Sequence, residues 1–135
     1  MSLNKPVDFT TAKLLKEKEY KDKNILGTVR LSEPKYYDPN GIIHSIKDAF
    51  EEIDYKIEDC FNAPTIVSVV MWLYEKHGIW ISVQPTSIVG KFQFRTYYNN
   101  KGVMNQHWND SMGKEFNSPT EAYEAAIEYT LKNLI

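Results

Sequence analysis

The residues best suited to chemistry in this sequence are three histidines and one cysteine: His44, His77, His107 and Cys60. Imidazole and thiolate groups bind zinc, and a zinc site usually takes ligands in pairs from one short segment, a few residues apart. No histidine here has a second histidine or a cysteine at that spacing. The spacing therefore favours structural roles for the histidines and predicts no metal site.

A cysteine nucleophile needs a thiolate, and the neighbours of Cys60 disfavour one. Glu58 and Asp59 come directly before it, and adjacent carboxylates raise the pKa of a thiol. The glycines are scattered singly rather than gathered in a phosphate-binding loop, and no serine lies in a nucleophile-elbow pattern. We predict no catalytic residue, no cofactor and a protein that is not an enzyme.

Residues 48–59 form an acidic segment with six Asp or Glu residues. Their order differs from that of a calcium-binding loop. A protein that imitates nucleic acid normally carries far more charge than the −2 of this chain. We interpret the segment as a solvated face rather than a cation site, folded as a short helix or turn followed by an extended piece.

The remaining candidate is the outward face of a predicted C-terminal sheet. Residues 79–84 alternate with Ile79 inward and Trp80 outward, and residues 91–98 alternate in the same way. The outward set combines aromatic, amide and arginine side chains: Trp80, Gln93, Arg95 and Tyr97, with either His107 or Trp108 from the third strand. Such a face suits a protein partner, and its rings also suit stacking on single-stranded nucleic acid.

A structural alternative competes with this binding face. A two-stranded hairpin is seldom stable alone, so the N-terminal helix and hairpin need a surface to pack on. If they pack on the outward face, they bury its rings. The sequence leaves both arrangements open.

The elements behind this face follow the order helix, three strands, helix. The helix over residues 65–77 begins after Pro64 and ends before Gly78, although its β-branched residues also suit a strand. The last helix begins at a capping box formed by Ser118 and Glu121. Its predicted buried stripe is Tyr123, Ala126, Ile127, Thr130, Leu131 and Leu134.

The N-terminal half predicts a helix over residues 7–20, capped by Asp8 or Thr10, and a hairpin. The hairpin joins residues 28–37 to 42–46 through the turn Asp38-Pro39-Asn40-Gly41. We expect an α+β protein with a mainly antiparallel sheet and helices on one face. Residues 1–62 form an N-terminal helix–hairpin extension packed on an α-β-β-β-α core of residues 63–135, in one compact domain.

A short pattern occurs twice. Tyr36-Tyr37 precedes Gly41-Ile42-Ile43 with the same spacing that separates Tyr97-Tyr98 from Gly102-Val103-Met104. The pattern is explained by two similar hairpins that arose independently. The alternative explanation is a helix–hairpin unit that was duplicated and has since diverged.

The composition and net charge of the chain limit its compartment and its partners. The chain has 135 residues, a net charge of −2 and a single cysteine, which fits a reducing compartment. No apolar run is long enough to span a membrane, so we expect a cytoplasmic protein without a membrane partner. The slight negative charge argues against a partner held by phosphate contacts.

The C-terminal half resembles the double-stranded-RNA-binding domain in its order of elements. The segment Ser118 to Ala126 (SPTEAYEAA) is similar to that family's closing helix. The family places lysines at the start of this helix, where they grip phosphates. The matching positions here are Pro119, Thr120 and Tyr123. The resemblance thus implies the topology and argues against binding of RNA.

A second resemblance covers nearly the whole chain. It is carried by five segments: Phe9 to Tyr20, Tyr36-Tyr37, Ala63-Pro64-Thr65, Trp72 to Ile79 (WLYEKHGI) and Glu121 to Ile135. In this order they are similar to a group of small phage and prophage proteins of gut Bacteroides-type bacteria. The group has no assigned activity, so the resemblance implies a mobile-element setting in a bacterial host cell.

These observations together predict a non-enzymatic binding or accessory protein. Its partner is expected to be another protein or a second copy of the chain. The alternative is a nucleic-acid-binding module that uses the same aromatic and arginine face.

Overall fold

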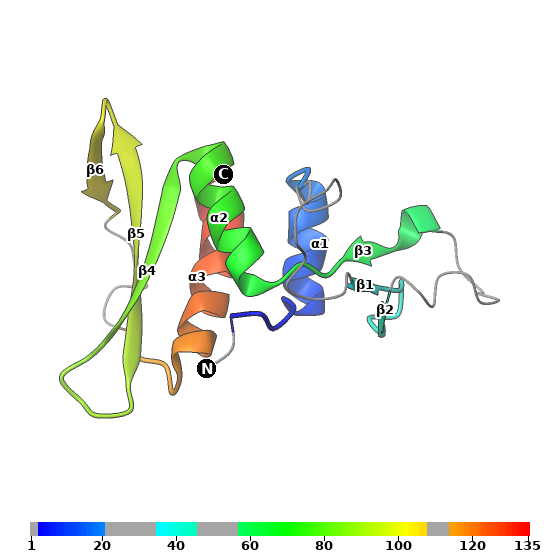
Figure 1. Ribbon diagram of the computed structural model, residues 1–135, viewed down its shortest axis with the longest axis horizontal. Coiled ribbons are helices and arrows are strands. Elements are labelled where there is room, and N and C mark those ends of the chain that lie inside the picture. The colour runs from blue at the N-terminus through cyan, green and yellow to red at the C-terminus, as the bar shows by residue number, and fades with distance from the viewer. Residues whose placement is uncertain (1–2, 21–34, 46–56, 108–113) are drawn as a thin grey trace. The chain divides into compact units, whose positions relative to one another are not determined.

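The computed structural model describes residues 3–20, 35–45, 57–107 and 114–135 (Figure 1). It contains helices and two antiparallel three-stranded sheets, which confirms the predicted α+β class. The chain divides into two compact units, Asn4–Thr65 and Ile66–Ile135, and Leu3 belongs with the second. The division thus lies close to the predicted boundary after residue 62, and the packing of the N-terminal part onto the core stays a prediction.

The C-terminal unit has the predicted α-β-β-β-α order. Its elements are α2 (Ile66–His77), β4 (Ile79–Pro85), β5 (Phe92–Asn100), β6 (Val103–Gln106) and α3 (Pro119–Asn133). The strands lie in the order β4-β5-β6, and both pairs are antiparallel. Each strand is therefore hydrogen-bonded to its neighbour in the sequence.

Helix α2 ends at His77, as the sequence predicts, and begins at Ile66, one residue later than predicted. Its core-facing residues are Ile66, Val69, Val70, Trp72 and Leu73. Gly78 ends it with a φ of +68°, a left-handed conformation that glycine adopts without a steric cost, and its amide donates to the Tyr74 carbonyl oxygen at 3.0 Å. This compact ending passes the chain directly into β4.

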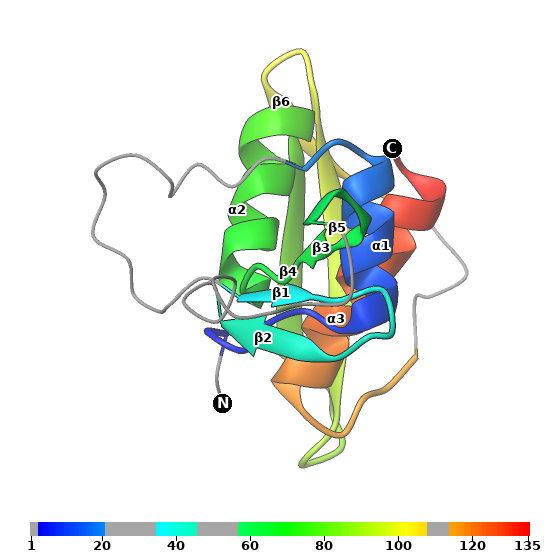
Figure 2. The same cartoon turned by 90° about the vertical axis from the view of Figure 1, so that its right-hand side faces the viewer.

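Helices α2 and α3 cover one face of the sheet, as predicted. Helix α2 packs on β4, and α3 packs on β4, β5 and α2. Figure 1 shows both helices on one side of the strands, and Figure 2 shows them in front of the sheet. The strand residues facing the helices are buried: Ile79, Ile81, Phe94 and Thr96. These residues and the buried faces of the two helices form the core of the unit.

The buried stripe of α3 agrees with the predicted one at its centre. Ala122, Ala126, Ile127, Thr130 and Leu131 are buried. The Thr130 hydroxyl donates to the Ala126 carbonyl oxygen at 2.8 Å, so burial leaves this polar group satisfied. The outlying members of the predicted stripe, Tyr123 and Leu134, are only half-buried.

The capping box of α3 is present. The Ser118 Oγ accepts a hydrogen bond from the Glu121 amide at 3.1 Å, and Pro119 occupies the first helical position. The Glu121 carboxylate reaches back to the amide of Asn117 at 3.1 Å. Two amides at the start of the helix thus have side-chain acceptors.

Ser118→Ala is expected to lower the free energy of unfolding by about 1 kcal/mol, because the Glu121 amide loses its acceptor. Urea denaturation measures the change. Ser87→Ala, at an exposed loop position between β4 and β5, is the matched control and should have no effect. Equal stability of the two variants would contradict the capping role.

The N-terminal unit consists of α1 (Phe9–Glu17), β1 (Lys35–Tyr37), β2 (Ile43–Ser45), the 3-10 turn η3 (Ile57–Asp59) and β3 (Phe61–Asn62). Asp8 caps α1 by accepting from the Thr11 amide at 2.7 Å, which decides between the two predicted caps. Thr11, Ala12 and Leu15 are the buried residues of α1.

The predicted N-terminal hairpin is confirmed for its described part. Strands β1 and β2 pair antiparallel, with Tyr36 opposite His44. Strand β3 pairs with the other edge of β1, an association that the sequence did not predict. Residues 28–34 of the predicted first strand and residues 48–56 of the acidic segment lie outside the described residues.

Asp38 organises the turn of this hairpin. Its Oδ1 accepts from the amides of Asn40 at 2.9 Å and Ile42 at 3.0 Å, and its Oδ2 lies 2.9 Å from the Nε2 of His44. The side chain is almost completely buried. The hydrogen bond to His44, followed by those to the two amides, holds the pKa of Asp38 below its usual value against the opposing effect of burial.

Because the folded pKa of Asp38 is lowered, its contribution to stability is present above the unfolded pKa of about 3.9 and is lost as pH falls through the folded pKa. Asp38→Asn is therefore expected to be less stable than the natural chain at pH 6, and the difference should shrink steadily as the pH falls below about 5. Thermal unfolding of both proteins across this pH range tests the expectation. A difference that does not change with pH would contradict it.

The repeated Tyr-Tyr pattern has different pairing in its two hairpins. Tyr37 lies opposite Ile43, whereas the matching Tyr98 lies opposite Asn105, one position beyond Met104. The second hairpin closes through Lys101 and Gly102, with φ values of 52° and +86°, which is the two-residue turn favoured between twisted strands. The shared pattern therefore does not give a shared register.

Candidate functional site

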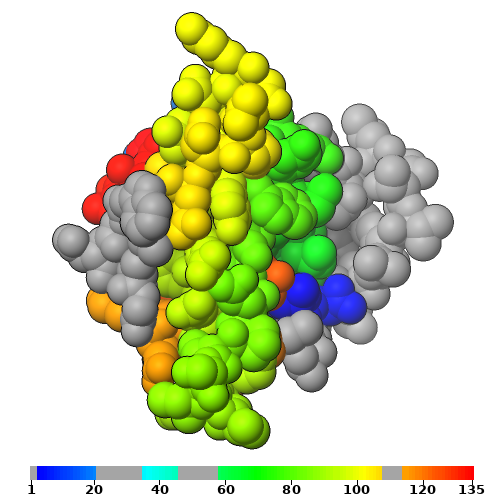
Figure 3. Space-filling view, turned by 90° about the vertical axis from the view of Figure 1, so that its left-hand side faces the viewer, coloured from blue at the N-terminus to red at the C-terminus, as the bar shows by residue number. Residues whose placement is uncertain are grey.

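The site is built on the face of the C-terminal sheet opposite α2 and α3, which we call the outer face. Strand alternation puts every second residue of β4 and β5 on it. The register sets Trp80 opposite Tyr97, and Ser82 opposite Arg95. Gln84 lies opposite Gln93. The four residues predicted from these two strands, Trp80, Gln93, Arg95 and Tyr97, therefore share one face, and Figure 3 views the unit from this side.

The third strand contributes two residues that the sequence prediction did not name. Gln106 lies opposite Tyr97, and Met104 lies opposite Asn99, so these two residues of β6 face outward. Strand β6 ends at Gln106. Trp108 lies outside the described residues.

His107 does not lie on the outer face. Its amide donates to the Thr96 carbonyl oxygen at 2.8 Å, and its Nδ1 is 3.0 Å from the Thr96 Oγ1. Thr96 is fully buried on the helix side, and the His107 ring centroid lies 4.7 Å from that of Tyr98 on the same side. Burial lowers the pKa of His107 and favours the neutral ring. Of the two alternatives that the sequence left open, His107 thus lies on the helix side, and Trp108 lies outside the described residues.

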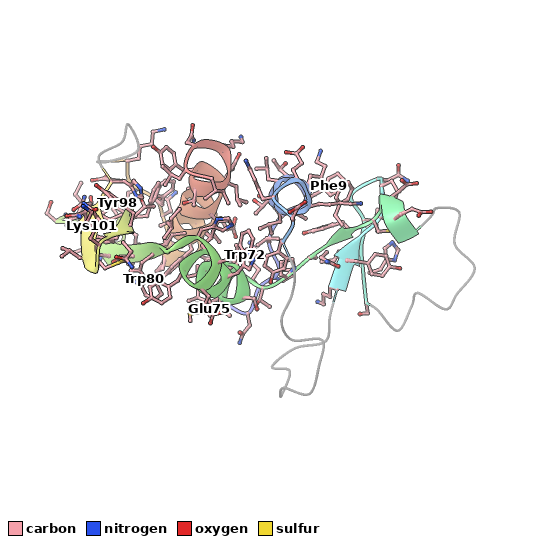
Figure 4. All side chains as sticks on the ribbon, turned by 90° about the horizontal axis from the view of Figure 1, so that it is seen from above. Phe9, Trp72, Glu75, Trp80, Tyr98 and Lys101 are labelled. Atoms are coloured by element: carbon pink, nitrogen blue, oxygen red, sulfur yellow. The ribbon has the colours of Figure 1, made fainter. Side chains whose placement is uncertain are left out.

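One half of the outer face is apolar. It comprises Trp80, Tyr97 and Met104, with Tyr74 of α2 at its border, and we call these four residues the apolar patch. Tyr74 and Trp80 are in edge-to-face contact with ring centroids 5.5 Å apart. The exposed fractions are 39% for Trp80, 43% for Met104 and 48% for Tyr74, so a substantial apolar surface faces water. In Figure 4, Trp80 is labelled close to α2.

The other half of the outer face is polar and centred on Arg95. With the Gln84 amide oriented by its neighbours, the Gln84 oxygen accepts from Arg95 Nε at 3.0 Å and Nη2 at 3.1 Å. The same oxygen accepts from Gln93 Nε2 at 3.1 Å. We call these three residues the Arg95 cluster. Their mutual hydrogen bonds fix the position of the guanidinium on the sheet.

Sequence reasoning missed Tyr74, Met104 and Gln106 as members of this face, and it missed the contact of Gln84 with Arg95. The alternation along β4 already places Gln84 outward, so its contact with Arg95 required only the register. Tyr74 gave no such signal, because the sharp end of α2 at Gly78 is what brings this helix residue beside Trp80.

The Cys60 region lacks the properties of an activated nucleophile. Burial raises the pKa of the Cys60 thiol, and the carboxylates of Asp38 and Asp59 raise it further against the opposing effect of Lys16. The ammonium group of Lys16 donates to the carbonyl oxygens of Glu58 and Cys60, at 2.5 Å and 3.0 Å. This arrangement ties α1 to the segment before β3 and favours the neutral thiol.

Among the described residues, no group of three His, Cys, Asp or Glu side chains is placed to hold a metal ion. Within the same residues, every helix is too short or too polar to cross a membrane. Comparisons of the chain with protein-family models, with curated proteins and with solved structures found no match.

Proposed function

We propose that this chain is a non-enzymatic binding or accessory protein that holds a protein partner on the outer face of its C-terminal sheet. One observation carries the proposal: α2 and α3 pack on one side of β4 and β5, while the other side presents Trp80 and Arg95 at diagonally adjacent outward positions. Trp80 remains 39% exposed there. Tryptophan, tyrosine and arginine are the residues that most often dominate binding energy at protein interfaces.

The composition of the face supports a protein partner. An interface commonly joins an apolar centre to polar groups at its rim. The apolar patch supplies the first and the Arg95 cluster the second. A second copy of the chain is included among the partners that this proposal admits. The resemblance to phage and prophage proteins supports action in the cytoplasm of a bacterial host.

A second candidate is a module for single-stranded nucleic acid. The adjacent rings of Trp80 and Tyr97, on a sheet that also carries Arg95, resemble the stacking platforms of such proteins. The net charge of −2 and the neutral residues Pro119, Thr120 and Tyr123 at the start of α3 favour the protein partner instead.

A pull-down from bacterial lysate, with and without nuclease, separates the two candidates. Bound material is identified by mass spectrometry. A protein that survives nuclease treatment, and that a Trp80→Ala/Arg95→Ala variant fails to capture, supports the first proposal. Loss of all captured material with nuclease supports the second, which also predicts binding that weakens steeply with salt.

A further inference from the structure

The described part of the outer face carries a single formal charge. Among the described residues at outward positions of β4, β5 and β6, Arg95 alone has an ionised side chain at neutral pH, and none is aspartate or glutamate. The chain as a whole has a net charge of −2. This face is therefore positive on a molecule that is otherwise slightly negative, and it is complementary to an anionic group.

The guanidinium of Arg95 is held in place but retains unused donors. The Gln84 oxygen accepts hydrogen bonds from the edge of the guanidinium formed by Nε and Nη2. A guanidinium has five N–H donors, so three remain, and two of these lie parallel on the edge formed by Nη1 and Nη2. No carboxylate of the described residues lies within ion-pairing distance of Arg95, whereas Lys132 has Glu128 at 2.6 Å. The free edge matches the two oxygens of a carboxylate.

We propose that the partner segment bound on this face presents a carboxylate to the Nη1–Nη2 edge of Arg95 and a large apolar side chain to the apolar patch. The inference rests on the proposed function and names the chemistry of its partner. Arg95 and Tyr97 are two residues apart on β5, which separates them by about 6.6 Å along the strand. An extended segment places its own side chains at positions two apart at the same interval. The expected recognition element is thus an Asp or Glu two positions from a large apolar residue.

The same charge argues against a second copy of this chain seated face to face about Arg95. A two-fold axis there would bring two guanidinium groups together. Like charges brought into contact at an interface repel and disfavour that association. The acidic segment of a different protein avoids this repulsion.

Selection from displayed random dodecapeptides tests the proposal directly. The baits are the full natural chain, Arg95→Gln and Lys76→Gln, where the last removes an exposed positive charge from α2, away from the outer face. The natural chain and Lys76→Gln should enrich peptides with an acidic residue two positions from a large apolar one. Arg95→Gln should lose the preference for the acidic position and bind the selected peptide at least about tenfold more weakly. Circular dichroism and unfolding transitions confirm that the baits remain folded.

Three outcomes would overturn the inference, and they differ in what they imply for the proposed function. If the enriched peptides lack an acidic residue, and their binding is lost in Trp80→Ala but kept in Arg95→Gln, the outer face remains the binding surface and the proposed carboxylate contact is wrong. If no enriched peptide depends on Trp80 or Arg95 for binding, both the carboxylate contact and the outer face as the binding surface are wrong. If a single-stranded oligothymidine binds in a manner that requires Arg95, and no acidic peptide is enriched, the anion that Arg95 recognises is a phosphate and not a carboxylate.

Discussion

Trp80→Ala is expected to weaken capture of the protein partner by roughly 30-fold or more, which corresponds to about 2 kcal/mol. Among the described residues, Trp80 provides the largest ring of the outer face. It is in edge-to-face contact with Tyr74 and is paired across the strands with Tyr97. Truncation removes the apolar surface that the partner is proposed to cover. Titration of the purified partner, once identified by pull-down, measures the effect.

The control for this prediction is Ile88→Ala. Ile88 is 53% exposed in the loop between β4 and β5, so its truncation also removes exposed apolar surface, but away from the apolar patch. Its capture of the partner should equal that of the natural chain. If a folded Trp80→Ala variant captures the partner as well as the natural chain does, the partner does not bind the outer face.

Leu73→Ala is expected to destabilise the protein by about 2–5 kcal/mol. Leu73 lies in α2, which packs on β4 and α3, and its side chain is fully buried. Removal of three carbon atoms from a closely packed site costs both the lost apolar burial and the cavity left behind. Urea denaturation, followed by circular dichroism, measures the difference in unfolding free energy.

Met71→Ala provides the matched control on the same helix. Met71 is 41% exposed, and surface substitutions of this kind usually change stability by less than about 0.5 kcal/mol. Similar effects of the two substitutions would show that α2 does not bury the face assigned here. A large effect confined to Leu73 would support the layered core.

The elements that the sequence predicted well are those with local signals. Pro64 before α2 and Gly78 after it mark the two ends of that helix, and Ser118 with Glu121 marks the start of α3. Each signal acts on amides or backbone angles within a few residues, so neighbouring sequence suffices to read it.

The alternation along β4 and β5 was equally readable, and for a similar reason. A strand with one buried face must repeat every two residues, so the inward position of Ile81 and the outward positions of Trp80 and Arg95 follow from the pattern. The sequence could therefore place four candidate residues on one face. It could not tell which residue of one strand lies beside which residue of the next.

Register is the property that required the tertiary structure. The two-residue turn at Lys101 and Gly102 sets Gln106 opposite Tyr97 and turns His107 toward Thr96. A shift of one residue would exchange the two faces of β6, and the sequence left both choices open for this reason. The pairing of β3 with β1 is undetermined by sequence in the same way, because two residues are too few to show a period.

By itself the sequence determined the class of the fold, the ends of its C-terminal helices and the side-chain types of the outer face, because propensities, caps and alternation act over short distances along the chain. Only the tertiary structure decided that Gln84 holds Arg95, that Tyr74 reaches Trp80 and that His107 leaves this face. Those contacts join residues from different elements, and their geometry depends on register and on the packing of α2 rather than on any local pattern.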